Sequence, residues 1–371
     1  MTSSTTKDHL FELTRQYASL SAQNTLIYGN ISHTTIQDFL IKNIISSDHF
    51  SQYPPSTQYQ KSFWKRVIVH LESSSNEDED AEFELSPDIY ERYLSLITSR
   101  PSGVKPSLSV GEGPPEKSFI TYFWKPPVNS PNRGVNEPYL KATLLESRAM
   151  IEMGTTGLNT WTASFVLAQY FVDHPDLVVG RDVLEFGSGI GFTAIVLSSL
   201  QVLWHRPHSR LGKLWFTDVE ETVLTTCQSN IALPCNLSSL HTGVKVQTLD
   251  WFASLDEERK PSVAKLLKED IAPHVIIGAD IVYDPLLIRP LLATLQMALE
   301  PDPRNSPICA LFALTLRTQR TKSEFFRTAK DMNLIVDDIS KEAPRSVAFL
   351  SGTTPHRDFQ DVNLFRFSMM T

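Results

Sequence analysis

Residues 183–192 read Val-Leu-Glu-Phe-Gly-Ser-Gly-Ile-Gly-Phe, an apolar stretch that runs into three closely spaced glycines. An apolar pattern continues over residues 193–200, so the region predicts a strand, a glycine-rich turn and a helix. Glycine tolerates positive φ and lets a ligand approach bare backbone, and the start of a helix offers unpaired amides. The pattern therefore favours a nucleotide-like ligand at this turn. A plain tight turn is the alternative.

An acidic residue and the glycine spacing narrow the choice of ligand. The glycines follow a GxGxG spacing, and Glu185 stands two residues before the first of them. Its carboxylate would repel a pyrophosphate but attract the ammonium group of a methionine moiety. S-adenosylmethionine carries that ammonium group and no phosphate. We predict it as the cofactor, with Glu185, Gly187, Ser188 and Gly189 among the residues that bind it.

The chain beyond residue 137 alternates short β-like runs with helical stretches, a pattern typical of an α/β fold. We expect a Rossmann-like parallel sheet with crossover helices. Seven strands are predicted, at residues 182–185, 214–217, 244–249, 275–279, 308–315, 334–339 and 362–367.

Polar residues stand at the ends of four successive predicted strands. Glu185 ends the first, Asp218 ends the second, Asp250 and Trp251 close the third, and Ala279 and Asp280 close the fourth. Ligands of open α/β sheets lie at the carboxyl ends of the strands, so we expect one crevice lined by these residues. Asp218 is suited to accept both ribose hydroxyls. A core position is the alternative for Trp251.

Two neighbouring segments bear on this crevice. Asp218 lies 29 residues after Gly189 rather than the usual ~20, and the loop at 204–208 accounts for the excess. The histidines in that loop have no third ligand nearby in the sequence, and no metal site is predicted. Upstream, residues 156–161 end in Trp161 and precede a helix that reaches Tyr170, so they are placed to fold over the cofactor as a lid.

The N-terminal part has a different texture. Helices are predicted at 34–45, 58–71 and 87–97, and the acidic stretch 73–82 is either a solvated loop or a docking strip. Residues 99–137 are rich in proline, glycine and serine but contain a strand-like aromatic run at 119–124. We divide the chain into a helical region with a proline-rich linker, 1–137, and a catalytic domain, 138–371. The first either recognises the substrate or completes the core fold.

Composition limits the function classes. The 371 residues carry 34 basic and 42 acidic side chains, a formal charge of −8, which disfavours nucleic acid as a direct partner. The three cysteines form no CxxC pair, the N-terminus lacks the apolar stretch of a signal peptide, and no apolar run would span a bilayer. We expect a monomeric cytoplasmic protein without a membrane partner.

Taken together, these segments resemble one family, the seven-strand class I methyltransferases, and within it the eukaryotic protein-lysine methyltransferases. The resemblance covers about residues 150–371. It rests on Gly157-Leu158-Asn159-Thr160-Trp161, on residues 184–191, on Thr217-Asp218 with Asn230, on Leu249-Asp250-Trp251 and on Asp280-Ile281-Val282-Tyr283. The helical region followed by Phe123-Trp124-Lys125-Pro126-Pro127 further resembles the elongation factor 2 lysine methyltransferases.

The resemblance implies a protein-lysine N-methyltransferase that uses S-adenosylmethionine. It implies that Asp280 and Tyr283 lie where the target lysine enters, and that Trp161, Asp250, Trp251 and Ala279 belong to the cofactor site. It also implies elongation factor 2 as the protein substrate. The alternatives are a methyltransferase for another protein or a small molecule, an inactive methyltransferase fold that only binds, and a nicotinamide oxidoreductase.

Overall fold

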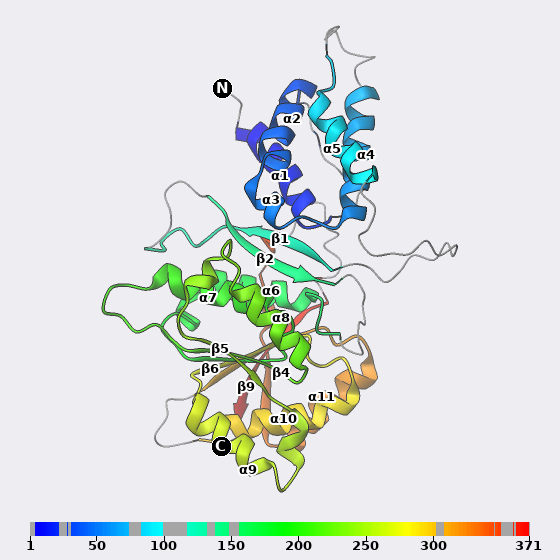
Figure 1. Cartoon of the computed structure of the whole chain (residues 1–371). Coiled ribbons are helices and arrows are strands. Elements are labelled where there is room, and N and C mark those ends of the chain that lie inside the picture. Colours follow the sequence, from blue (N-terminus) through cyan, green and yellow to red (C-terminus); the bar gives the residue numbers. More distant parts are fainter. Residues whose placement is uncertain are drawn as a thin grey trace. The chain divides into compact units, whose positions relative to one another are not determined.

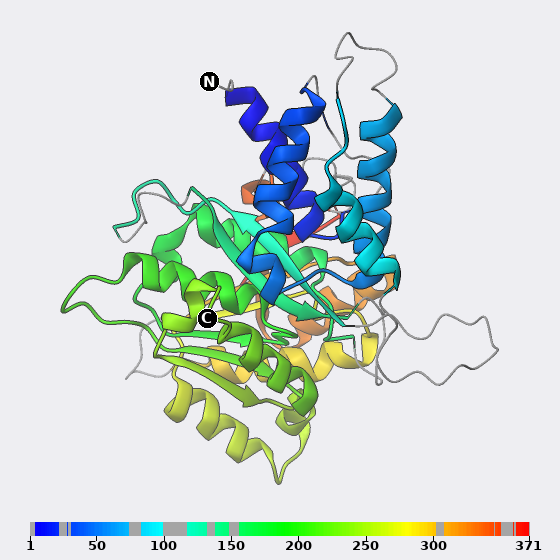
Figure 2. The same ribbon diagram turned by 45° about the horizontal axis from the view of Figure 1, so that its top comes forward.

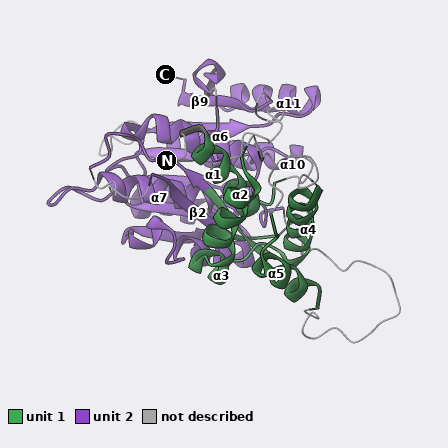
Figure 3. Cartoon of the chain, turned by 90° about the horizontal axis from the view of Figure 1, so that it is seen from above, with its two compact units in different colours: residues 1–122, 145–149, 350–354 green, residues 123–144, 150–349, 355–371 purple. Residues whose placement is uncertain are grey.

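The computed structural model describes residues 4–21, 28, 31–73, 83–98, 117–131, 138–147, 156–301, 308–344, 346–349, 359 and 361–370. The chain divides into two compact units, which Figure 3 colours separately. Unit 1 comprises Met1–Tyr122, Leu145–Ala149 and Leu350–Thr354, and unit 2 comprises Phe123–Leu144, Met150–Phe349 and Pro355–Thr371. The boundary predicted at residue 137 lies outside the described residues and stays a prediction. Within the described ranges, no helix is both long and apolar enough to cross a membrane.

The helices of unit 1 gather in its N-terminal part (Figures 1 and 2). They are α1 (Ser4–Ala18), α2 (His33–Leu40), the π-helix η2 (Ile41–Ile45), α3 (Asp48–Gln52), α4 (Thr57–Ser73) and α5 (Pro87–Thr98). The three predicted helices are present, whereas α1 and α3 were not predicted. The α5 helix begins at Pro87, the first residue of the predicted range, and the Ser86 hydroxyl accepts from the amide of Asp88.

The helix predicted over 34–45 changes type in its middle. It is α-helical to Leu40 and continues as a π-helix to Ile45. Asn43 donates its side-chain amide to the carbonyl of Phe39, at 2.9 Å. That carbonyl would accept the backbone amide of residue 43 in an α-helix, so the side chain competes with the α-helical hydrogen bond.

An aromatic cluster around Tyr17 holds unit 1 together. The Tyr17 ring lies 4.9 Å from the ring of Phe63 and 5.1 Å from that of Phe50, centroid to centroid. Its hydroxyl donates to the side-chain oxygen of Gln60 at 3.0 Å, and burial raises the pKa of Tyr17 to about 12. These contacts fasten α1 to α3 and α4.

A two-stranded sheet, β1 (Ser118–Trp124) with β2 (Leu140–Glu146), contributes residues to both units. In unit 1, Tyr53 packs on Phe119 of β1 at 5.2 Å between ring centroids. In unit 2, Trp124 packs on Phe349 at 5.9 Å, and Asn236 bonds the backbone of Thr143 in β2 through both side-chain atoms at 2.8 Å. The run predicted at 119–124 is therefore a strand, and β2 was not predicted.

Unit 2 contains a seven-stranded sheet in the order β5-β4-β3-β6-β7-β9-β8. The strands are β3 (Val183–Phe186), β4 (Leu214–Asp218), β5 (Val244–Thr248), β6 (Val275–Ala279), β7 (Cys309–Leu314), β8 (Leu334–Asp338) and β9 (Asn363–Met369). All seven predicted strands are confirmed. The expectation of a wholly parallel sheet is wrong for β9, which runs antiparallel to β7 and β8. Between β8 and β9 the described residues form only the short 3₁₀ helix η8 (Ser340–Glu342), not the crossover helix that parallel neighbours need.

Helices cover both faces of this sheet, α6, α7 and α8 along one and α9, α10 and α11 along the other (Figure 1). Their bounds are α6 (Thr162–Asp173), α7 (Phe192–Trp204), α8 (Glu221–Ile231), α9 (Lys260–Lys265), α10 (Pro285–Leu299) and α11 (Gln319–Asp331). The short helices are η4 (Pro175–Leu177), η5 (Leu237–Leu240), η6 (Trp251–Leu255) and η7 (Leu266–Ile271).

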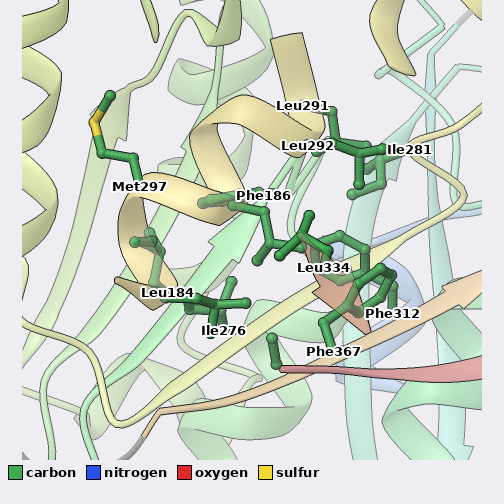
Figure 4. Packing of buried hydrophobic residues seen from close by; sticks show 14 of the residues in the cluster. Leu184, Phe186, Ile276, Ile281, Leu291, Leu292, Met297, Phe312, Leu334 and Phe367 are labelled. Atoms are coloured by element: carbon green, nitrogen blue, oxygen red, sulfur yellow. The ribbon is translucent and has the colours of Figure 1, made fainter. Parts of the chain in front are cut away.

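The core between the sheet and α10 fixes where the site lies. Leu184, Phe186, Ile276 and Phe312 on the strands pack with Leu292 of α10 in one buried cluster (Figure 4). The chain passes from β3 to β4 on one side, and later returns to β6 on the other side of β3. Such a reversal opens a crevice at the carboxyl end of β3, where doubly wound folds bind ligands.

Candidate active site

A cavity of about 200 Å³ lies at that crevice, at the carboxyl ends of β3, β4, β5 and β6. The four strand ends predicted to meet do meet there. The wall of the cavity includes the predicted residues Trp161, Gly187, Ser188, Gly189, Asp218, Asp250, Trp251, Ala279, Asp280 and Tyr283. Their roles toward a ligand stay predictions, but the structure brings them together.

The glycine turn has the backbone that its sequence predicts. Gly187, Gly189 and Gly191 have φ of +63°, +53° and +92°, the left-handed region that glycine adopts without strain. The turn is tied to β4, because the amide of Ser188 donates to the carbonyl of Thr217 at 2.8 Å and the Ser188 hydroxyl accepts from the amide of Thr217 at 2.9 Å. A ligand in the cavity therefore meets a fixed backbone.

The segment 156–161 lies against this turn. A Cβ on Gly189 would stand 3.1 Å from the carbonyl oxygen of Gly157, a tight contact, and the φ of +53° also favours glycine here. The Trp161 indole donates to the carbonyl of Thr156 at 3.0 Å, and the Arg317 guanidinium lies 5.6 Å from the centre of the Trp161 ring. The segment forms one wall of the cavity, and its movement as a lid remains a prediction.

Asp218 lines the cavity beside the glycine turn. One carboxylate oxygen accepts from the amide of Gly189 at 3.2 Å, and the other accepts from the amide of Val219 at 2.8 Å. Burial raises its pKa, while these backbone hydrogen bonds act in the opposite direction. The extra residues between Gly189 and Asp218 lie in the loop between α7 and β4. The long sequence separation therefore does not displace Asp218 from the site.

Glu185 departs from the predicted picture, because it is buried beneath the turn and does not form part of the cavity wall. The residue is 2% exposed, and its side chain hydrogen-bonds to Ser188 and Thr193. Its Oε2 has no hydrogen-bond partner among the described residues. Burial raises its pKa to about 8, and the charge of Asp218 adds to the shift. The strand was predicted to end at Glu185 but continues to Phe186. Glu185 therefore lies within the strand, where alternate side chains point to opposite faces, and not at its end.

Cys227 of α8 closes the turn from below. Its thiol is fully buried and would stand 2.8 Å from a Cβ on Gly191. Burial, with the nearby charges of Glu185 and Asp218, raises the pKa of this thiol. Burial is the largest cause of the raised pKa of both Cys227 and Glu185, and it favours the uncharged form of each side chain.

Asp250 and Trp251 follow β5 and make different kinds of contact, the first polar and the second mainly apolar. Asp250 caps η6 through the amide of Phe252 at 2.9 Å and pairs with Arg259 at 2.7 Å. Trp251 packs on Phe186, 6.2 Å between ring centroids, and its buried Nε1 has no partner among the described residues. Trp251 is thus both a core aromatic residue and a cavity residue.

Asp280 belongs to the cavity wall, and one of its carboxylate oxygens has no hydrogen-bond partner among the described residues. Its backbone has φ of +53°, and its amide donates to the carbonyl of Ala313 at 2.9 Å. Its Oδ1 accepts from the amide of Thr315 at 2.9 Å, whereas Oδ2 is buried without a partner among the described residues. A carboxylate held in this way is suited to receive an ammonium group.

Tyr283 stands at the open side of the cavity, and its hydroxyl hydrogen-bonds to the side chain of Thr156. Thr315 and Arg317 follow β7 and contact Asp280 and Trp161, respectively; neither was predicted as a site residue. Applying the strand-end rule to the fifth parallel strand would have found both. The described residues hold no cluster of three or more His, Cys, Asp or Glu suited to a metal ion.

Comparison with known proteins identifies the family. A family model described as "Lysine methyltransferase" matches residues 145–332, just over half of the chain. The chain belongs to the lysine methyltransferase family. This membership confirms the resemblance drawn from the sequence, with its class I fold and its protein-lysine methyltransferase activity, and it sets aside the nicotinamide oxidoreductase.

The curated relatives carry the same kind of name. The chain is 26% identical to protein-lysine N-methyltransferase EFM3 of Chaetomium thermophilum over 296 residues, 78% of this chain and 77% of the relative. It is 28% identical to human protein-lysine N-methyltransferase EEF2KMT over 254 residues, 66% of this chain and 62% of the relative. The mouse EEF2KMT is 27% identical over 281 residues, 74% and 69% of the two chains.

Proposed function

We propose that this lysine methyltransferase transfers methyl groups from S-adenosylmethionine to a lysine side chain of translation elongation factor 2. The similarity to EFM3 spans 78% of the chain, so it extends beyond the family match into residues before 145. The relatives named EEF2KMT support elongation factor 2 as the substrate. The single observation that carries the chemistry is the unpartnered Oδ2 of Asp280 in the strand-end cavity.

The residues of the cavity fit S-adenosylmethionine. A Cβ on Gly187 would stand 2.7 Å from the side chain of Ile281, so this wall depends on bare glycine backbone. We assign the methionine moiety to the glycine turn, the ribose hydroxyls to Asp218, and the remaining contacts to Trp161, Asp250, Trp251 and Ala279. When bound, the cofactor supplies an activated methyl group as a sulfonium. Glu185 does not contact the cofactor in this assignment; it supports the turn through its hydrogen bonds to Ser188 and Thr193.

The protein must mainly align a neutral amine and exclude water. A free lysine with a pKa of about 10.4 needs roughly 4 kcal/mol for deprotonation near neutral pH. The buried carboxylate of Asp280 attracts the incoming ammonium and orients the amine, and Tyr283 forms the side of the channel. The Asp280 carboxylate raises the pKa of the lysine and the desolvated channel lowers it, so the ammonium releases one proton to solvent water as the amine enters, and no strong general base is required.

The test of the catalytic site is Asp280→Asn, which keeps the shape and removes the charge. We expect S-adenosylmethionine affinity, measured by calorimetry, to stay within about twofold, and kcat/KM for protein methylation to fall about tenfold or more, at least ~1.4 kcal/mol of transition-state stabilisation. Asp337→Asn, at an exposed aspartate on β8, is the control. A loss of cofactor affinity with normal turnover would place Asp280 in the cofactor site instead.

The substrate is tested separately, by incubating the enzyme with purified elongation factor 2 and labelled S-adenosylmethionine, and mapping methyl-lysine by mass spectrometry. Methylation of one lysine is the expected result. If elongation factor 2 stays unlabelled while another protein in a lysate is labelled, elongation factor 2 is not the substrate. The catalytic assignment would be unaffected by that result.

A further inference from the structure

Four exposed apolar side chains belong to two segments that contribute to the cavity wall, η6 and the start of α10 with the residues before it, and we name them the mouth shelf. Leu286 is 75% exposed, Tyr283 65%, Phe252 47% and Leu255 40%. Tyr283 and Phe252 also form part of the cavity wall. The shelf is therefore continuous with the site.

Two elements that pack on each other carry the shelf. Phe252 and Leu255 are three residues apart in η6, so they share one face of a 3₁₀ helix. Tyr283 precedes α10, and Leu286 lies in its first turn. The Ser254 hydroxyl donates to the carbonyl of Pro290 at 3.2 Å and lies 3.1 Å from the hydroxyl of Thr294, which holds η6 against α10.

The buried neighbours of the shelf residues show that their exposure is not forced by poor packing. Ala253 and Ser254 of η6 are buried between the two exposed residues, and Ile288 and Leu291 of α10 are buried in the core. Both elements thus have a filled inward face, and the outward side of η6 and of the first turn of α10 is apolar. Adjacent exposed apolar groups beside a site are typical of a binding surface.

A lysine that reaches Asp280 enters the cavity beside these segments, so the backbone that carries it lies on the shelf. On this ground, which rests on the proposed function, we propose that the mouth shelf binds the substrate polypeptide next to its target lysine. Leu286 and Leu255 are then specificity-determining residues. The apolar surface selects a substrate segment with at least one apolar side chain beside the lysine.

The charges around the shelf define the substrate further. Segments 250–256 and 280–290 contain the acids Asp250, Asp256, Asp280 and Asp284, with Arg289 as their one basic residue. Asp250 and Asp256 are paired with Arg259, at 2.7 and 3.0 Å, whereas Asp284 caps α10. This environment disfavours an acidic residue next to the target lysine and admits a basic one. The expected segment is therefore apolar and uncharged or basic.

The experiment uses the full chain with Leu286→Asn, Leu255→Asn and the double variant, which remove apolar surface without adding charge. Leu240→Asn is the matched control, because Leu240 is 66% exposed in η5, before β5. For the labelled protein substrate we expect KM to rise about fivefold in each single variant and further in the double variant. kcat, S-adenosylmethionine affinity by calorimetry and the melting temperature should stay close to those of the wild type.

The outcomes separate this proposal from the substrate assignment. If wild type labels a protein other than elongation factor 2, KM is measured with that protein, and only the substrate name fails. Unchanged KM in the double variant would overturn the shelf proposal, as would a wild-type enzyme that labels small molecules but no protein in a lysate. A change of oligomeric state in the variants, with KM unchanged, would assign the shelf to self-association instead.

Discussion

Glu185 is a carboxyl group that the fold keeps protonated. Its pKa of about 8 stands above the ordinary value of 4.5 because the side chain is buried. Between those two pH values the folded state keeps a proton that the unfolded state has released. The free energy of unfolding therefore falls as pH rises through this window, and the loss is complete above pH 8.

Glu185→Gln removes that titration while keeping the shape. We expect its free energy of unfolding, relative to wild type, to increase from pH 5 to pH 8, by at most about 4 kcal/mol at roughly 1.36 kcal/mol per pH unit. Urea unfolding at several pH values measures the difference. Glu257→Gln, at an exposed position, should show no such trend. Parallel curves for Glu185→Gln and wild type would contradict a protonated Glu185.

Gly189 tests the contact between the glycine turn and residues 156–161. In Gly189→Ala the new Cβ strains a backbone at φ +53° and meets the Gly157 carbonyl at 3.1 Å. We expect cofactor affinity to fall about tenfold and stability to fall by about 1–2 kcal/mol. Gly180→Ala is the control, since Gly180 has φ +69° with its nearest atom at 3.7 Å and lies outside the cavity. It should lose stability but keep the affinity.

Among the elements, we predict that β1 stabilises unit 2 through Trp124. Trp124 is 1% exposed and packs on Phe349, whose ring lies 5.1 Å from that of Phe192 at the start of α7. Trp124→Ala should destabilise unit 2 by about 3–5 kcal/mol, as expected for a buried aromatic residue. Thermal unfolding with and without S-adenosylmethionine checks this. Val128→Ala, at a residue 83% exposed, should change little.

The elements that sequence reasoning found are those with strong local patterns. The seven strands of the large sheet are apolar runs between loops, and the cavity followed from their carboxyl ends. The direction of β9 depends on the connection before it, and in the π-helix η2 the Asn43 side chain bonds a carbonyl that an α-helix would use, a contact that the apolar spacing does not reveal. Helix α1 is held by the aromatic cluster around Tyr17, and its buried residues Leu10, Leu13 and Tyr17 recur at helical spacing, a local pattern that the sequence reasoning did not use. Glu185 was correctly placed beside the glycine turn, but it was expected in the cavity wall and is instead buried beneath the turn.

At the scale of the whole molecule, β1 decides where the chain can be cut. A chain that begins at residue 138, the predicted domain boundary, lacks Trp124 and should be unstable. A chain that begins at residue 117 keeps β1 and should bind S-adenosylmethionine with near-normal affinity. If the helical region recognises the substrate, this longer chain should still fail to methylate elongation factor 2. Normal methylation by it would contradict the recognition role.

The thiol of Cys227 can be used to measure how often the glycine turn opens. It lies directly under Gly191 and is fully buried with a raised pKa, so a thiol reagent reaches it only when the turn opens. In a background with Cys235→Ser and Cys309→Ser, the rate of alkylation would count those openings. S-adenosylmethionine should slow that rate in proportion to its occupancy of the site. Alkylation of this one sulfur atom would therefore report how often the glycine turn opens.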